Sequence, residues 1–253
     1  GTPVVLHLFY VAKIGLYILF GAVFALATSG IDGWSNIGQW WTEPIVLQKV
    51  VLYTMLFEIL GLGCGFGPLN NRFYPPMGSV LYWLRPGTIR LPPWPNRVPL
   101  TRGDNREPID VLLYGALLMM LVVALFSDGT GPDPALGTDI GLLPAWQSWT
   151  ILALVALAGL RDKVLFLAIR GEVYVPFVVA FLFGGPNVLI AAKLACVVIW
   201  MGAATSKLNK HFPFVISTMM SNSPVIRARW LKRRFFENFP DDLRPGPLSR
   251  ALA

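Results

Sequence analysis

The sequence predicts an all-α fold, a polytopic membrane helix bundle of about six transmembrane helices. Hydrophobic residues make up 55% of the 253 residues and charged residues only 14%, whereas a soluble domain usually carries about a quarter charged residues. Mean hydropathy is +0.58. The apolar residues gather in long runs, and the basic residues are segregated in the segments between them. These observations indicate that lipid is the solvent for much of the molecular surface.

Six apolar runs match the length of a membrane-spanning helix, which needs ~20 predominantly apolar residues and tolerates about 17 to 25. They cover 3–28, 45–63, 109–127, 141–160, 164–183 and 188–206. Pro44 and Pro108 stand just before the second and third runs, where proline favours the first turn of a helix. The first run is too long for the core of a signal peptide and lacks a small-residue cleavage site after it, so we expect a true span.

The fifth run is interrupted by polar and helix-breaking residues, namely Arg170, Gly171, Glu172 and Pro176. We therefore expect a short interfacial helix followed by a short or broken span. Broken helices are tolerated at membrane depth where protein or a water-filled cavity covers the freed backbone.

The distribution of basic residues predicts the orientation of these spans. Of the 21 Lys and Arg residues, 18 fall in segments 64–108, 161–172 and 206–253, and none falls in loops 29–44 and 128–145. Positive charge collects on the cytoplasmic side of a membrane. Five tryptophans lie at the predicted outer boundary, as in an aromatic belt: Trp34, Trp40, Trp41, Trp146 and Trp149. We expect a multi-pass protein of the plasma membrane with both termini cytoplasmic.

Two parts follow from this topology, a transmembrane bundle over 1–206 and a basic cytoplasmic or interfacial tail over 207–253. The bundle includes the long cytoplasmic loop 64–108, which is rich in proline, glycine and arginine. Long loops of this kind tend to carry function. Two interpretations remain open, an ordered cytoplasmic cap and a surface that binds anionic headgroups.

The tail contains a pattern typical of an amphipathic basic helix. Ser223 is a good N-cap and Pro224 a good first helical residue, and Leu231, Phe235 and Phe239 follow at intervals of four. Five basic residues accompany them: Arg227, Arg229, Lys232, Arg233 and Arg234. Such a helix suits an anionic membrane surface, so we expect these residues to bind lipid headgroups. In a polytopic protein we expect no nucleic-acid partner.

Charged residues within the apolar runs are costly, by ~2.5 to 3.5 kcal/mol each on insertion scales, and they raise a functional hypothesis. Lys49 and Lys193 lie near the outer ends of their runs and are expected to snorkel to the interface. Lys13 and Glu58 lie deeper, at similar depths in the first two helices, so we expect an intramembrane charge pair. A structural ion pair and a proton, ion or substrate site both remain open for it.

A second polar cluster follows the sixth run, in GAATSKLNKHFPF. Lys207, Lys210 and His211 are candidate catalytic bases because lysine and histidine pKa values respond strongly to their surroundings. A plain stop-transfer flank explains the two lysines equally well. The sequence contains no zinc-protease helix, nucleophile elbow, P-loop or array of metal ligands, and it identifies no cofactor.

Four long segments carry a resemblance to a known family. They read GLGCGFGPLNNRFYPPMGSVLYWLRPGTIRLPPWP, LFSDGTGPDPALGTDIGLLP, RDKVLFLAIRGEVY and AATSKLNKHFPFVISTMMSNSP. Together they resemble an actinobacterial family of multi-pass transmembrane proteins of unknown function, over essentially the whole chain. The resemblance implies a membrane protein that forms the N-terminal part of a longer member.

Two classes of function follow from these features. The first is an integral membrane protein of the cell envelope that handles or transports a lipid-like or ionic ligand, or organises a complex with protein partners in the membrane. The alternative is a membrane-embedded enzyme acting on a quinone or polyprenyl-type lipid with a Lys or His base. The sequence leaves open whether the protein is an enzyme.

Overall fold

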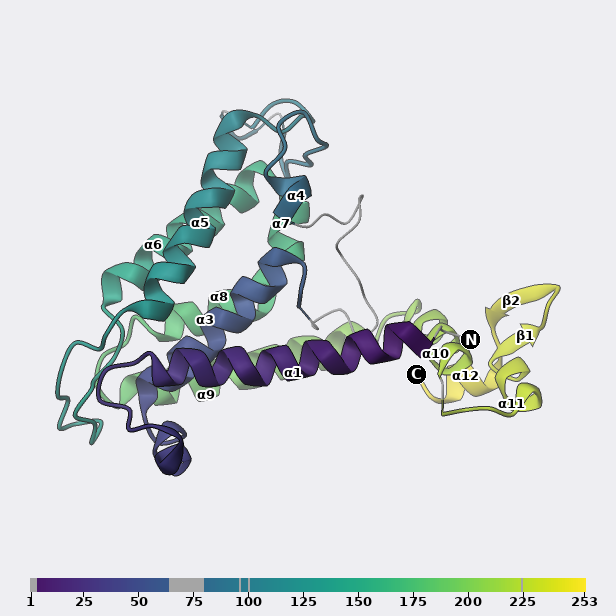
Figure 1. Ribbon diagram of the computed structural model, residues 1–253. Helices are drawn as coiled ribbons and strands as arrows, with labels where there is room; N and C mark the ends of the chain where they lie inside the picture. Colours follow the sequence, from purple (N-terminus) through teal and green to yellow (C-terminus); the bar gives the residue numbers. More distant parts are fainter. Residues whose placement is uncertain (1–3, 64–79, 96, 100, 224) are drawn as a thin grey trace. The chain divides into compact units, whose positions relative to one another are not determined.

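The computed structural model describes residues 4–63, 80–95, 97–99, 101–223 and 225–253, and the described chain is mostly helical (Figure 1). Residues 64–79 of the long basic loop lie outside the described residues. The chain divides into two compact units, one over Tyr10–Ala195 and one that combines the part up to Phe9 with Cys196–Ala253. We call the first the bundle and the second the terminal unit, and describe each by itself.

The bundle is organised around helix α3 (Pro44–Leu60), of which 12 of the 17 residues are buried. A helix that is apolar on nearly all sides belongs in the interior, and α3 follows this rule. Helix α1 (Val4–Leu26) contacts it through aromatic side chains, with Tyr17 and Phe20 packing edge-on against Phe57. The connection between them contains a short 3₁₀ helix, η1 (Trp34–Asn36), and helix α2 (Ile37–Trp40).

Two long antiparallel helices, α5 (Pro108–Phe126) and α6 (Ala145–Arg161), pack side by side (Figure 1). Helix α5 also packs against α3, and its residues Leu117, Leu121 and Leu125 are completely buried there. The segment before α5 holds the short helix α4 (Val80–Trp83) and an isolated bridge between Ile89 and Asn105. We call residues 80–108 the arginine cap, of which residues 96 and 100 are not described.

The predicted interruption of the fifth apolar run is present. Helix α7 (Lys163–Ala168) ends, and α8 (Gly171–Ala180) begins after Arg170, whose φ of 55° is left-handed. A side chain at Gly171 would collide with the ring of Phe166. The chain therefore turns sharply here, and α8 packs against α3 and α6.

The terminal unit contains the C-terminal part of α9 (Asn187–Lys207), then α10 (Phe212–Asn222), α11 (Arg229–Arg233) and α12 (Pro247–Ala251). Strands β1 (Phe236–Asn238) and β2 (Asp242–Pro245) form an antiparallel hairpin between α11 and α12.

The prediction of one amphipathic helix after Ser223 is wrong. Ser223 follows the last residue of α10, and the basic segment forms only the five-residue α11 before the chain becomes extended. Phe235 explains the change, because its carbonyl oxygen accepts hydrogen bonds from Gly246 N at 2.9 Å and Ser249 Oγ at 2.7 Å, and its ring is buried. Contacts with residues farther along the chain thus override the local helical pattern.

In the described residues, three helical segments have the length and apolar composition of a membrane span: Leu8–Leu26, Pro108–Phe126 and Asn187–Lys207. Helices α3 and α6 have 17 residues each. At about 1.5 Å per residue, 17 residues reach about 26 Å, slightly less than the ~30 Å hydrocarbon core of a bilayer.

Candidate functional site

A buried polar centre lies at the C-terminal end of α3. Gly61 ends the helix in a left-handed conformation (φ 81°), and the chain turns back so that Gly63 lies against the carboxyl group of Glu58. A Cβ atom at residue 63 would collide with that carboxyl group. The Nζ of Lys13 donates to Gly63 O at 3.0 Å, and Lys13 and Glu58 are each 2% exposed. One glycine therefore brings the two deep charged side chains to the same place.

The prediction that Lys49 snorkels to the interface is wrong. Its side chain is 1% exposed, and its Nζ donates to Thr28 Oγ1 at 2.7 Å. The Thr28 hydroxyl in turn donates to Phe24 O at 2.9 Å, within α1. Lys49 thus links α3 to the end of α1, whereas Lys193 on α9 is exposed.

After the end of α1, Ser29 forms hydrogen bonds with the exposed Asp128, and these hydrogen bonds lower the pKa of the Asp128 carboxyl group.

An aromatic groove lies between α1, α2 and α3, with a volume of about 420 Å³. Nearly all of its lining is apolar or aromatic. The lining residues are Tyr17, Ile18, Gly21, Ala22, Ala25, Trp34, Ile37, Trp40, Trp41, Val46, Val50 and Tyr53. We call this cavity the tryptophan groove.

Small residues on α1 leave the space that forms the tryptophan groove. A Cβ atom at Gly21 would stand 3.4 Å from the hydroxyl oxygen of Tyr53, an ordinary contact, so the glycine leaves room without being sterically required. The Tyr53 hydroxyl donates to Tyr17 O at 3.0 Å, which joins α1 and α3 beside the groove. On the α2 side, the rings of Trp34 and Trp40 lie 5.5 Å apart.

One residue that lines the tryptophan groove, Trp40, carries a buried polar atom without a partner in the described chain. Trp40 is 8% exposed, and its Nε1–H has no hydrogen-bond partner in the described part of the chain. A buried donor left unsatisfied costs about 1–3 kcal/mol. The groove therefore has largely apolar walls, and one of its lining residues carries a buried indole N–H without a partner in the described chain.

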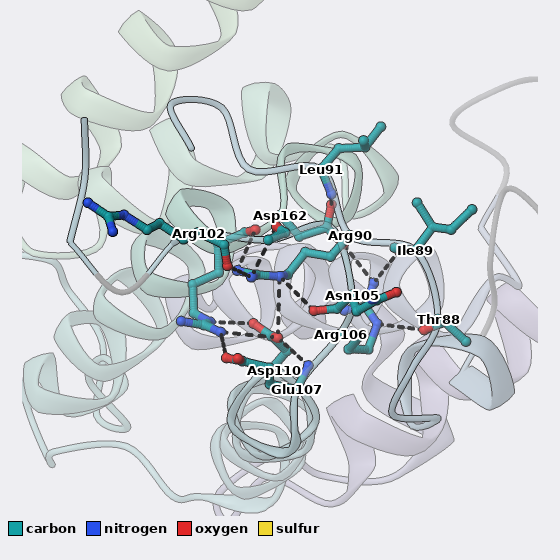
Figure 2. A network of polar contacts seen from close by, with 12 residues as sticks. Thr88, Ile89, Arg90, Leu91, Arg102, Asn105, Arg106, Glu107, Asp110 and Asp162 are labelled. Atoms are coloured by element: carbon teal, nitrogen blue, oxygen red, sulfur yellow. Dashed lines mark hydrogen bonds and ion pairs between the residues drawn. The ribbon is translucent and has the colours of Figure 1, made fainter. Parts of the chain in front are cut away.

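The arginine cap is built around two buried guanidinium groups (Figure 2). The first belongs to Arg106, which forms an ion pair with Asp162 at 2.6 Å and donates from Nε to Thr88 Oγ1 at 3.0 Å. Its Cζ lies 4.7 Å from the centroid of the Trp83 ring, a cation–π distance. Asp162 caps α7 by accepting from Val164 N at 3.0 Å, so the pair joins the cap to the α6–α7 corner.

The second buried guanidinium group belongs to Arg90, which mainly binds backbone carbonyl groups. Its Nη2 donates to Arg102 O at 2.7 Å and to Gly103 O at 3.3 Å, its Nε to Asn105 O at 3.2 Å, and its Nη1 to Arg161 O at 3.4 Å. A charged donor in such a buried position rigidifies the segments that it binds. Arg90 thereby fixes the cap backbone against the end of α6.

The first turn of α5 anchors a third arginine. Glu107 and Asp110 form a capping box there, with Glu107 N donating to Asp110 Oδ2 at 2.7 Å. Arg161 donates from Nε to Asp110 and from Nη2 to Glu107 Oε2, the latter at 2.5 Å. The same Asp110 lies 3.6 Å from Arg90 Nε. Glu107, Asp110 and Asp162 are therefore the counter-ions of the cap and of the adjoining Arg161.

Sequence reasoning did not single out Arg90, Arg106 or Asp162 as buried. Two acidic residues at helix ends could have predicted this burial: Asp110 in the first turn of α5 and Asp162 between α6 and α7. Acids at those positions, opposite a loop with many arginines, indicate ion pairs that tie the loop to the helices.

The candidate catalytic bases Lys207, Lys210 and His211 are all exposed in the terminal unit. Asn209 shapes this turn, since its Oδ1 accepts from His211 N at 2.7 Å. None of the three lines any of the cavities described here. In the described segments, His, Cys, Asp and Glu form no group of three or more that could hold a metal ion.

The predicted headgroup-binding residues also lie in the terminal unit. Arg227, Arg229, Arg233 and Arg234 are exposed, whereas Lys232 is half-buried and donates to Ser223 O at 3.0 Å. A cavity of about 360 Å³ brings part of this set together with two aromatic rings. It is lined by Ser221, Asn222, Arg229, Lys232, Arg233, Phe236 and Phe239.

Comparison with known proteins then gives the family. A family described as "Transmembrane protein of unknown function (DUF3556)" matches residues 1–253. The chain belongs to this family. The expected resemblance to transmembrane proteins of unknown function is thereby confirmed, and DUF3556 is a membrane protein family, in agreement with the three span-like helices. No curated protein and no solved structure matches this DUF3556 chain.

Proposed function

We propose that this protein binds a lipid-like molecule in the plasma membrane, and that the tryptophan groove is the binding site. The observation that carries the proposal is a cavity of about 420 Å³ with largely apolar walls, whose lining residue Trp40 has a buried indole N–H without a partner in the described chain. Ligand sites typically enclose ~300–1,000 Å³ and pair apolar walls with a few polar groups that set orientation.

The unpartnered indole N–H of Trp40 indicates the chemistry of the ligand. An indole N–H only donates, so the matching group is an acceptor, such as the carbonyl oxygen of an ester or a quinone. The aromatic rings of Trp34, Trp41 and Tyr53 provide flat surfaces for an acyl or prenyl chain beside it. A hydrogen bond made here replaces an unsatisfied donor, so it contributes more than one made at a water-exposed site.

The orientation in the membrane belongs to the same proposal. Six spans with both termini cytoplasmic leave loops 29–44 and 128–145 outside, and the arginine cap and basic tail inside. The groove then opens near the outer interface, at the depth where tryptophan is enriched. The basic residues of the tail, with the cavity at Arg229, Lys232 and Arg233, suit anionic headgroups on the inner leaflet.

The test fills the groove and leaves the rest of α1 unchanged. In Gly21→Leu the new side chain enters the groove, whereas Gly15→Leu is a matched control on the same helix, with nothing within 4 Å of the added Cβ. Trp40→Phe removes the N–H and keeps an aromatic ring. Each full chain is purified in mild detergent, and bound lipid-like molecules are measured by native mass spectrometry.

We expect the wild type and Gly15→Leu to retain the same apolar adduct, and Gly21→Leu to lose it. Trp40→Phe should weaken retention by about tenfold, because a hydrogen bond from a buried group is worth roughly 1.4 kcal/mol. Equal adducts in the wild type and Gly21→Leu would show that the molecule binds elsewhere, and the proposal would then fail.

A further inference from the structure

A second cavity lies on the arginine cap, beside the first turn of α5, and has a volume of about 740 Å³. It is separate from the tryptophan groove and shares no residue with it. Three arginines, one glutamate and three apolar residues line it: Arg97, Val98, Pro99, Arg102, Glu107, Ile109 and Arg161. We call it the cap pocket.

The charges in the cap pocket do not balance. The Arg161 guanidinium is neutralised by Asp110 and by Glu107, the one acid in the lining. The side chains of Arg97 and Arg102 form no hydrogen bond or ion pair with the described residues, and Figure 2 shows Arg102 pointing away from the buried network. Two guanidinium groups thus face the cavity without a counter-ion from the described chain.

The backbone beneath the arginines is held in place. Arg90 donates to the carbonyl oxygens of both Arg102 and Arg161, at 2.7 Å and 3.4 Å. One buried side chain therefore sets the spacing between two of the three pocket arginines. A backbone held in this way lowers part of the ordering cost of binding an anion.

The other wall of the cap pocket is apolar and continues into a membrane span. Ile109 is the second residue of α5, a helix long and apolar enough to cross a bilayer. Val98 and Pro99 extend this apolar wall on the cap side. An anion bound at the arginines would have the start of an apolar chain in contact with Ile109.

From this arrangement we propose that the cap pocket binds the phosphate group of an anionic lipid. Guanidinium groups form paired, charge-assisted hydrogen bonds with phosphate oxygens. A free phosphate ion satisfies the arginines equally well but leaves the Val98, Pro99 and Ile109 wall unused, so the geometry favours the amphiphile. Arg97 and Arg102 supply the unneutralised charge for the phosphate, whereas Arg161 remains paired with Asp110 and Glu107.

The experiment uses the full chain in detergent and three soluble probes: dioctanoyl phosphatidic acid, dioctanoyl phosphatidylcholine and inorganic phosphate. The affinity of each probe is measured by titration with native mass spectrometry and by ³¹P NMR. The test variant is Arg97→Gln/Arg102→Gln. The matched control is Arg85→Gln/Lys163→Gln, which removes the same charge from exposed positions outside the pocket.

We expect dioctanoyl phosphatidic acid to bind the wild type and the control variant equally, and the test variant at least about tenfold more weakly, since two charge-assisted contacts are lost. Inorganic phosphate binding as tightly as phosphatidic acid would overturn the lipid assignment. Equal weakening in both double variants would show a general surface-charge effect and would overturn the site. Both test positions are exposed, and a matching elution profile in size-exclusion chromatography verifies that each variant folds.

Discussion

At the scale of single residues, Gly63 is the position where the side chains of Lys13 and Glu58 meet. The Lys13 ammonium donates to its carbonyl oxygen, and the Glu58 carboxyl group lies against its α-carbon. Depth in the apolar runs was the only reason to expect Lys13 and Glu58 near one another. Their meeting point requires a residue without a side chain, because the left-handed Gly61 turns the chain back onto its own helix.

If Lys13 and Glu58 form the expected charge pair, removing one of the two charges leaves the other buried and uncompensated. We expect Lys13→Met and Glu58→Gln each to lower the free energy of unfolding by about 3–5 kcal/mol, the usual cost of breaking a buried pair. The double variant should recover most of that loss. Reversible unfolding with sodium dodecyl sulfate in mixed micelles measures all three.

Lys193→Met is the matched control, because Lys193 is also a lysine within an apolar run but is exposed. Its effect should stay within about 0.5 kcal/mol. Additive losses in the double variant, with no recovery, would show that Lys13 and Glu58 do not compensate one another.

At the scale of elements, the break between α7 and α8 illustrates how one residue conformation divides an apolar run. The sequence suggested an interruption at Arg170, Gly171, Glu172 and Pro176. The break occurs at the first of these, Arg170, and Pro176 lies inside α8. The tail shows the opposite case. Its helical periodicity was clear, yet the buried ring of Phe235 and its carbonyl contacts with Gly246 and Ser249 produce a hairpin instead.

Substitutions at Arg170 should report its left-handed backbone. A left-handed conformation costs a non-glycine residue roughly 1–2 kcal/mol, and β-branching makes it less favourable. We expect Arg170→Val to lower the free energy of unfolding by about 1–2 kcal/mol relative to Arg170→Gly. Both variants lose the partly exposed ion pair with Glu172, so the comparison isolates the backbone. Equal stability of the two variants would show that the turn is not left-handed in the membrane.

At the scale of the whole molecule, the distribution of charged residues predicts the membrane topology. The arginine cap and tail hold most of the basic residues, and the loop at Ala135 holds none. Two of the cap arginines are also structural, since Arg90 and Arg106 are buried with acidic or carbonyl partners. In the proposed topology, these residues serve both membrane orientation and the packing of the cap on α5 and α6.

Single-cysteine labelling tests the proposed orientation. Cys64→Ser and Cys196→Ser give a background without native thiols, into which Ala135→Cys or Arg85→Cys is introduced, both at exposed positions. A membrane-impermeant maleimide applied to intact cells should label the Ala135→Cys protein and leave the Arg85→Cys protein unlabelled until the cells are permeabilised. Labelling of Arg85→Cys in intact cells would contradict the proposed orientation and would place the cap pocket at the outer leaflet.

The sequence by itself determined that this is a helical membrane protein and where its long helices lie. Apolar runs of about 20 residues have few alternatives to helices in a bilayer, because every backbone polar group must be satisfied within the segment. That constraint acts within each segment, so the composition and periodicity of the segment are enough to predict a helix. The positions of α1, α3, α5, α6 and α9 match the predicted runs to within a few residues.

Only the tertiary structure decided which polar groups are buried and which cavities exist. Arg106 and Asp162 are 56 residues apart in sequence, and nothing local distinguishes Arg106 from the exposed Arg102 four positions earlier. The tryptophan groove likewise depends on the packing of α1, α2 and α3 around Trp40. Burial and pairing arise from contacts between segments that are distant in the sequence. A single sequence shows which residues can form an ion pair, but it does not show which of them meet in the fold.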